Sequence, residues 1–198
     1  MRQFPQLNPK MKLTPRRLKV AGWLAVASSF LTLPWFLFTY PLADRQDLIF
    51  TAVKAGMMIG RLTLLIYLFL VFQQLLTKRY AFTGANVTIS LLIQASIVHT
   101  SAVMLGLVVP ELAAAVTVFG LVMAVIIGVL HIMFGMWLLH LPASLGGMHR
   151  PYCYLNIVTG FALASVILLP LAMVTSTISD LMLGTIFLYA TKSSPLTA

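Results

Sequence analysis

Apolar stretches long enough to cross a bilayer as helices recur along this chain, and very few charges interrupt them. Hydrophobic residues make up 60% of the sequence and charged residues only 9%, whereas a soluble domain carries roughly 25% charge. Such sparse charge cannot cover a water-facing surface, and a disordered chain would combine low hydrophobicity with high charge. The sequence therefore predicts an all-α integral membrane protein that crosses the bilayer several times.

Five apolar stretches are expected to form a transmembrane helical bundle, and the C-terminal segment is expected to be an interfacial or half-span helix with a tail. The five spans are residues 20–40, 55–76, 86–109, 112–141 and 153–174, and the C-terminal segment is 176–198. The alternative is a sixth span over 171–191. It would need a turn near Pro170 among apolar residues, where lipid leaves backbone groups unsatisfied.

Basic residues predict the orientation, because the loops on the cytoplasmic side of a membrane are enriched in Lys and Arg. Residues 1–19 hold six of the 13 basic residues and are expected to form a cytoplasmic arm. Lys78, Arg79 and Arg150 then fall in inner loops, which places the N-terminus inside and, with five spans, the C-terminus outside. The acidic residues Asp44, Asp47, Glu111 and Asp180 all fall on the outer side.

The basic arm also predicts the partners. Lys and Arg beside a membrane are attracted to an anionic leaflet, so the arm is expected to contact anionic lipids of a bacterial inner membrane. The chain is also expected to contact other membrane proteins or a second copy of itself. Nucleic acid is not expected as a partner, because the remaining basic residues form no stripe interleaved with aromatics.

Arg61 is the most informative single position, because a charge inside a span usually faces the protein interior or a wet cavity. Asp47, Lys54 and Arg61 are spaced by seven residues and share one helix face. One interpretation is that Lys54 and Arg61 extend to the outer interface. The other is a polar intramembrane cluster in which Arg61 pairs with Asp180.

Three other polar residues inside spans, Gln94, His99 and Asn156, are expected to form hydrogen bonds between helices. Small residues at four-residue spacing mark possible close helix contacts. They are Ala21, Ala25 and Ser29; Gly56 and Gly60; Ala102 and Gly106; and Gly160 and Ala164.

No cofactor or metal is expected from the histidines and the single cysteine, Cys153. His99 and His131 lie at different depths in the membrane, about 12 Å apart along its normal, and His131 and His140 face opposite sides of one helix. Two axial haem ligands would need a common level. His140, His149 and Cys153 lack the tight ligand spacing of structural metal sites.

Three functions are weighed on these observations. The first is a non-catalytic accessory, scaffold or assembly subunit, since no catalytic motif is present. The alternative is a small transporter or channel for an anionic solute that uses Arg61 and Lys54. The third is a membrane haem or metal protein. The sequence leaves open whether the protein is an enzyme, although the missing catalytic motifs favour a non-enzyme.

Overall fold

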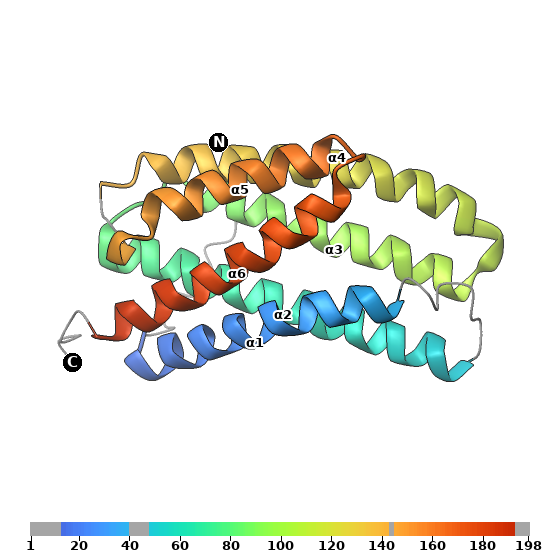
Figure 1. The fold of residues 1–198 in the computed structure, drawn as a ribbon, viewed down its shortest axis with the longest axis horizontal. Helices are drawn as coiled ribbons and strands as arrows, with labels where there is room; N and C mark the ends of the chain where they lie inside the picture. The colour runs from blue at the N-terminus through green and yellow to red at the C-terminus, as the bar shows by residue number, and fades with distance from the viewer. Residues whose placement is uncertain (1–12, 40–47, 143–144, 193–198) are drawn as a thin grey trace.

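The computed structural model describes residues 13–39, 48–142 and 145–192, and its side chains over 13–30, 49–142 and 145–192. Within these ranges all regular secondary structure is helical, as the sequence predicted. Six α-helices account for most of it (Figure 1): α1 (Pro15–Thr39), α2 (Leu48–Tyr80), α3 (Asn86–Val108), α4 (Ala113–Leu139), α5 (His149–Ala164) and α6 (Leu169–Lys192). Two short 3-10 turns, Pro110–Leu112 and Leu145–Gly147, precede α4 and α5.

Four of the described helical segments are long and apolar enough to cross a membrane, which supports an integral membrane protein. They are Ile49–Tyr80, Asn86–Val108, Pro110–Leu139 and Leu169–Lys192. Their outer surfaces carry many exposed apolar side chains, such as Val108, Val118 and Val122. An apolar surface of this extent fits lipid rather than water.

The six helices form a ring in sequence order. Each helix packs against the helix before it and the helix after it, and α6 packs against α1, so that the ring closes. The turn between α3 and α4 is tight because Val109 ends α3 in an extended conformation and Pro110 begins the next turn. Proline suits a first helical position, where its missing N–H is not needed.

Two pairs of glycines let neighbouring helices approach to backbone contact. A Cβ atom on Gly128 of α4 would lie 2.6 Å from the carbonyl oxygen of Gly160 on α5. A Cβ atom on Gly184 of α6 would lie 2.9 Å from the carbonyl oxygen of Gly22 on α1. Lipid provides no hydrophobic drive for helix association, so this close packing is a main source of attraction between the helices.

The helices at the C-terminal end differ from the predicted fifth span over 153–174. The helix ends at Ala164, and α6 begins at Leu169 after a turn in which Val166 has a φ of 60°. Ser165 supports this turn: its hydroxyl donates to the carbonyl oxygen of Ala162 and accepts a hydrogen bond from the backbone N–H of Leu168. Pro170 then lies in the first turn of α6. Hydrophobicity alone did not reveal the break, because the turn residues are themselves mostly apolar.

The described end of α6 lies at the same end of the bundle as the start of α1, which differs from the prediction of N- and C-termini on opposite sides (Figure 1). The reason is the hairpin of α5 and α6, which returns the chain to the end where α5 starts. At that end the Nη1 atom of Arg79 on α2 donates a hydrogen bond of 2.6 Å to the carbonyl oxygen of Ala190. This bond joins the last turns of α2 and α6.

Candidate intramembrane polar cavity

A cavity of about 90 Å³ lies inside the ring of helices, and every helix contributes to its lining. Its volume leaves room for a few water molecules or a solute of a few non-hydrogen atoms. The lining is unusually polar for the interior of a membrane bundle. The polar residues are Ser28, Arg61, Ser96, His131, Tyr152, Asn156, Thr159, Ser176, Ser179 and Asp180.

Arg61 of α2 and Asp180 of α6 line this cavity together. The Arg61 side chain is exposed, so it marks the side where the cavity meets the surface of the bundle, whereas Asp180 is partly buried. Arg61 is the cation that acts electrostatically on the Asp180 carboxylate. Within the described residues no ion pair of 4.0 Å or less joins the two side chains.

A chain of hydrogen bonds runs across the cavity wall from α4 to α6. The amide nitrogen of Asn156 donates to the carbonyl oxygen of Tyr152 (2.9 Å) and to the hydroxyl of Ser179 (3.1 Å). These two acceptors orient the amide, so its oxygen faces the Nδ1 atom of His131 at 3.2 Å. An amide oxygen only accepts, so Nδ1 of His131 carries a proton. In the neutral ring Nε2 is then the basic nitrogen.

A second contact closes the α5–α6 side of the cavity. The hydroxyl oxygens of Thr159 and Thr175 lie 2.8 Å apart. Each hydroxyl also has a backbone carbonyl of its own helix within reach, that of Leu155 for Thr159 and that of Leu171 for Thr175. Polar contacts between membrane helices contribute about 0.6 kcal/mol on average and up to about 2 kcal/mol, so this wall is fixed by several modest bonds.

Aromatic side chains fill the bundle between the cavity and the end that carries Arg79. The ring of Phe72 lies edge-on to Phe134, Tyr152 and Phe187, at centroid distances of 6.2, 5.8 and 6.1 Å. Phe72 and Phe187 are fully buried, and each follows the cavity-lining residues of its own helix. We call Phe72, Phe134, Tyr152 and Phe187 the aromatic plug, because they separate the cavity from that end of the bundle.

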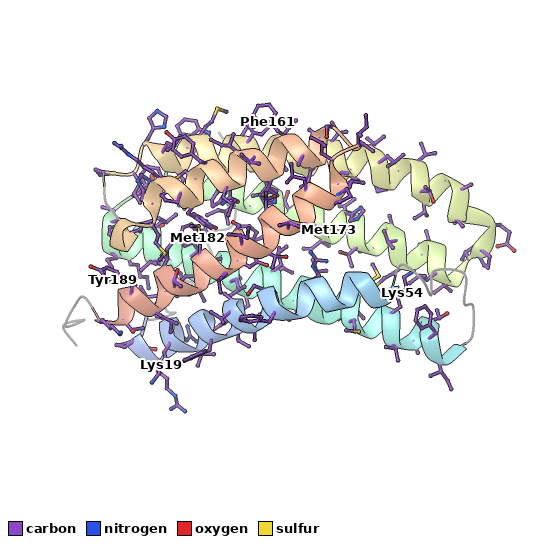
Figure 2. All side chains as sticks on the ribbon, in the orientation of Figure 1. Lys19, Lys54, Phe161, Met173, Met182 and Tyr189 are labelled. Atoms are coloured by element: carbon purple, nitrogen blue, oxygen red, sulfur yellow. The ribbon has the colours of Figure 1, made fainter. Side chains whose placement is uncertain are left out.

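The other two members of the predicted polar cluster are Lys54 and Asp47, of which only Lys54 lies among the described residues. Lys54 lies on α2 seven residues before Arg61, which is about 10 Å along the helix axis, and it does not line the cavity. Figure 2 labels Lys54 toward the end of the bundle opposite Lys19. Asp47 lies outside the described residues, as do residues 1–12 of the predicted basic arm.

The residues expected to bond between helices take three different positions. Asn156 joins α5 to both α4 and α6. Gln94 is exposed on α3. His99 faces α4, where its Cε1 atom lies 3.7 Å from the position a Cβ on Gly120 would take. Its Nδ1 atom is buried and has no hydrogen-bond partner within the described part of the chain.

Several cavity residues were not singled out from the sequence, although a helical pattern contains them. Tyr152 and Thr159 flank the predicted Asn156 at spacings of four and three residues, and Ser176 and Ser179 are three apart. Such spacing places polar groups on one face of an otherwise apolar helix. The signal was weak because hydroxyl side chains also bond to their own helix and are common in membrane spans.

Over the ranges that the structure describes, no group of three or more His, Cys, Asp or Glu side chains is placed to hold a metal ion. The polar cavity brings the ionisable side chains of Arg61, His131 and Asp180 to one lining. A scan against models of protein families and searches of curated proteins and of solved structures find no match to this chain.

Proposed function

We propose that this protein is a small membrane transporter or channel that binds an anionic solute in the polar cavity. The observation that carries the proposal is the presence of a guanidinium, a carboxylate and an imidazole on one cavity inside an apolar bundle. Ionisable groups inside a membrane are costly and usually mark a path for ions or substrates. A purely structural bundle has no need of them.

Arg61 is the proposed anion-binding group. A guanidinium has five N–H donors in a planar fork and binds oxyanions through two parallel hydrogen bonds. Its exposed position at the edge of the cavity suits a residue that first meets a solute. Hydroxyl groups of Ser96 and Ser176, which also line the cavity, are suited to complete the shell around a small anion.

The aromatic plug supports a transport cycle rather than an open pore. Its rings pack edge to face around Phe72, and in this proposal a solute at Arg61 passes them only after a rearrangement. Many transporters open a central site to one side of the membrane at a time. In this proposal α6 is the moving element, because the turn at Val166 separates it from α5.

The sidedness of the bundle forms part of the proposal. Most described basic residues gather at the plugged end, where α1 begins and α2 and α6 end, and this end is proposed to be cytoplasmic. They are Arg16, Arg17, Lys19, Lys78, Arg79, Arg150 and Lys192. Glu111 lies at the opposite turn between α3 and α4. The cavity therefore faces the non-cytoplasmic side through Arg61.

A role as an accessory or scaffold subunit was favoured on sequence alone, mainly because catalytic motifs are missing. The cavity makes transport the better-supported proposal, since helix packing with partners would use the outer surface and not the interior. The accessory role remains testable by co-purification from mild detergent.

Reconstituted vesicles test the transport proposal. Chloride, nitrate and inorganic phosphate serve as probes, and accumulation inside protein-containing vesicles is compared with accumulation in empty ones. Arg61→Leu is expected to lower uptake of the transported anion at least tenfold, because the cavity loses its cation. Arg150→Leu, which removes an exposed arginine that does not line the cavity, is the matched control. Unchanged uptake by Arg61→Leu would rule out the proposed site.

A further inference from the structure

Among the described residues that line the cavity, one positive and one negative charge balance each other in the absence of a solute. Arg61 supplies one positive charge and Asp180 one negative charge, and they come from helices α2 and α6. The remaining lining residue with an ionisable ring nitrogen is His131 on α4, and α5 contributes Tyr152, a phenol that is neutral near pH 7. Helices α1 and α3 contribute the uncharged side chains of Ser28, Ser96 and Leu92.

A bound anion disturbs this balance. When an anion binds the guanidinium of Arg61, this arginine, the one cation among the described lining residues, is shared between Asp180 and a second negative charge. The site then carries a net charge of minus one inside a low-dielectric bundle, where an uncompensated charge costs several kcal/mol. One proton taken up at the cavity restores neutrality.

Resting on the proposed function, we infer that the cavity binds a small monovalent anion together with one proton, and that the Asp180 carboxylate accepts this proton. The proton comes from water on the side to which the cavity is open and forms an O–H bond on a carboxylate oxygen of Asp180. The anion binds Arg61 without covalent change. The anion and the proton are then released on the other side of the membrane. One cycle therefore moves a neutral pair and no net charge.

Asp180 rather than His131 is the expected acceptor, because Arg61 acts electrostatically on the Asp180 carboxylate and an anion bound to Arg61 offsets that effect. His131 is held by Asn156, which is fixed in turn by Tyr152 and Ser179. Protonated Asp180 is neutral, and it lies next in sequence to Ser179 at the end of this hydrogen-bond chain.

Calorimetry in detergent tests the inference and separates it from the proposed function. Nitrate or chloride is titrated into the full-length protein in two buffers of equal pH but different ionisation enthalpy. Uptake of one proton makes the two binding heats differ by the difference between the buffer enthalpies. Binding with the same heat in both buffers overturns the proton coupling but leaves the anion site, whereas no binding of either anion overturns both proposals.

Two variants identify the acceptor. Asp180→Asn is expected to bind the anion and to lose the dependence of the heat on buffer, whereas His131→Gln is expected to retain it. Loss of the buffer dependence in His131→Gln alone would overturn the assignment to Asp180. In vesicles, uptake by the wild type is expected to be insensitive to an imposed membrane potential, and uptake by Asp180→Asn is expected to become sensitive to it.

A different surface carries a second, independent inference. A shallow surface hollow of about 630 Å³ is lined by described residues of α1. Arg16 and Lys19 lie at its basic end, and Val20, Trp23, Leu24 and Ala27 continue it for two turns. Trp23 is 59% exposed and Val20 is 45% exposed, although both are apolar. Figure 2 labels Lys19 at this end of α1.

We propose that this hollow binds one anionic phospholipid from the leaflet at the plugged end. Arg16 and Lys19 are one helical turn apart and are placed to bind the phosphodiester group of a lipid. The apolar residues beyond them are placed to contact the start of an acyl chain. Tryptophan is enriched at the level of lipid headgroups. Along α1 the basic residues come first, then the aromatic ring and then the apolar residues. This order matches the headgroup, interface and acyl-chain layers of a bilayer.

Native mass spectrometry with phosphatidylglycerol and phosphatidylcholine tests the lipid site. The double variant Arg16→Gln with Lys19→Gln is expected to lower retention of phosphatidylglycerol at least threefold, with no change for phosphatidylcholine. The control is Arg150→Gln with Lys192→Gln, which removes two exposed cations at the same end outside the hollow. An equal loss in both double variants would show a general attraction to charge and overturn the site.

Discussion

The Nδ1 atom of His131 lies 3.2 Å from the amide oxygen of Asn156, so one hydrogen bond joins the interior of α4 to the interior of α5. Asn156 also donates to Ser179 on α6. A single amide therefore connects three consecutive helices around the cavity. This relationship orients the imidazole and defines the wall on which Asp180 lies.

Asn156→Ala is expected to lower the free energy of unfolding by about 1–3 kcal/mol, because it leaves His131 and Ser179 without their partner inside the bundle. Unfolding in a mixed detergent titration, followed by far-UV circular dichroism, measures the change. Asn86→Ala is the control, since Asn86 makes only a long, exposed contact of 3.5 Å with Thr77. Equal stability of the two variants would show that the amide network contributes little.

Gly128→Ala is expected to destabilise the bundle by about 1–3 kcal/mol, because its Cβ would collide with the backbone of α5 and push the helices apart. Gly56→Ala provides the contrast, since no described atom lies within 4 Å of a Cβ at that position. Alanine favours a helix over glycine by up to about 1 kcal/mol, so this control is expected to be neutral or slightly stabilising. Thermal stability in detergent compares the two, and a similar loss in both would contradict the close α4–α5 packing.

Cysteines at Val26 and Gly184 are expected to form a disulfide on mild oxidation, because a Cβ on Gly184 would lie 2.8 Å from the Cγ2 atom of Val26. The native Cys153 is replaced by alanine in this experiment. Non-reducing electrophoresis after cleavage between α1 and α6 detects the cross-link. Val26→Cys with Gly56→Cys is expected to give none. The reverse result would exclude the packing of α6 against α1.

Cysteine labelling tests the sidedness. In a background of Cys153→Ala, Lys192→Cys is expected to react with an impermeant maleimide only from the cytoplasmic side, and Glu111→Cys only from the opposite side. The physical reason is the α5–α6 hairpin, which returns the chain to the basic end. Five full spans would instead place both cysteines on the outer side, so labelling of both from one face would reject the proposed arrangement.

The class of the protein follows from its sequence. The runs of apolar residues and the low content of charge are local properties, and they require lipid and backbone hydrogen bonds satisfied within helices. The approximate positions of the helices that became α2, α3 and α4 follow for the same reason, since Pro110 and the polar segment near Lys78 and Arg79 interrupt the apolar pattern. The sequence also predicts Arg61 and Asp180 as site residues, because each is a charged residue among apolar neighbours.

The arrangement of these residues around one cavity depends on the packing of the helices. The turn at Val166 that separates α5 from α6 depends on the hydrogen bonds of the Ser165 hydroxyl and on the packing of α6 against α1. Neither can be read from the hydropathy of the sequence. The role of His131 was likewise hidden, because its partner Asn156 is 25 residues away and on another helix. The sequence determines which side chains of each helix can face lipid and which must be buried inside the bundle. Which polar groups meet in the middle depends on helix rotation and register, and these are fixed only when all six helices pack around one cavity.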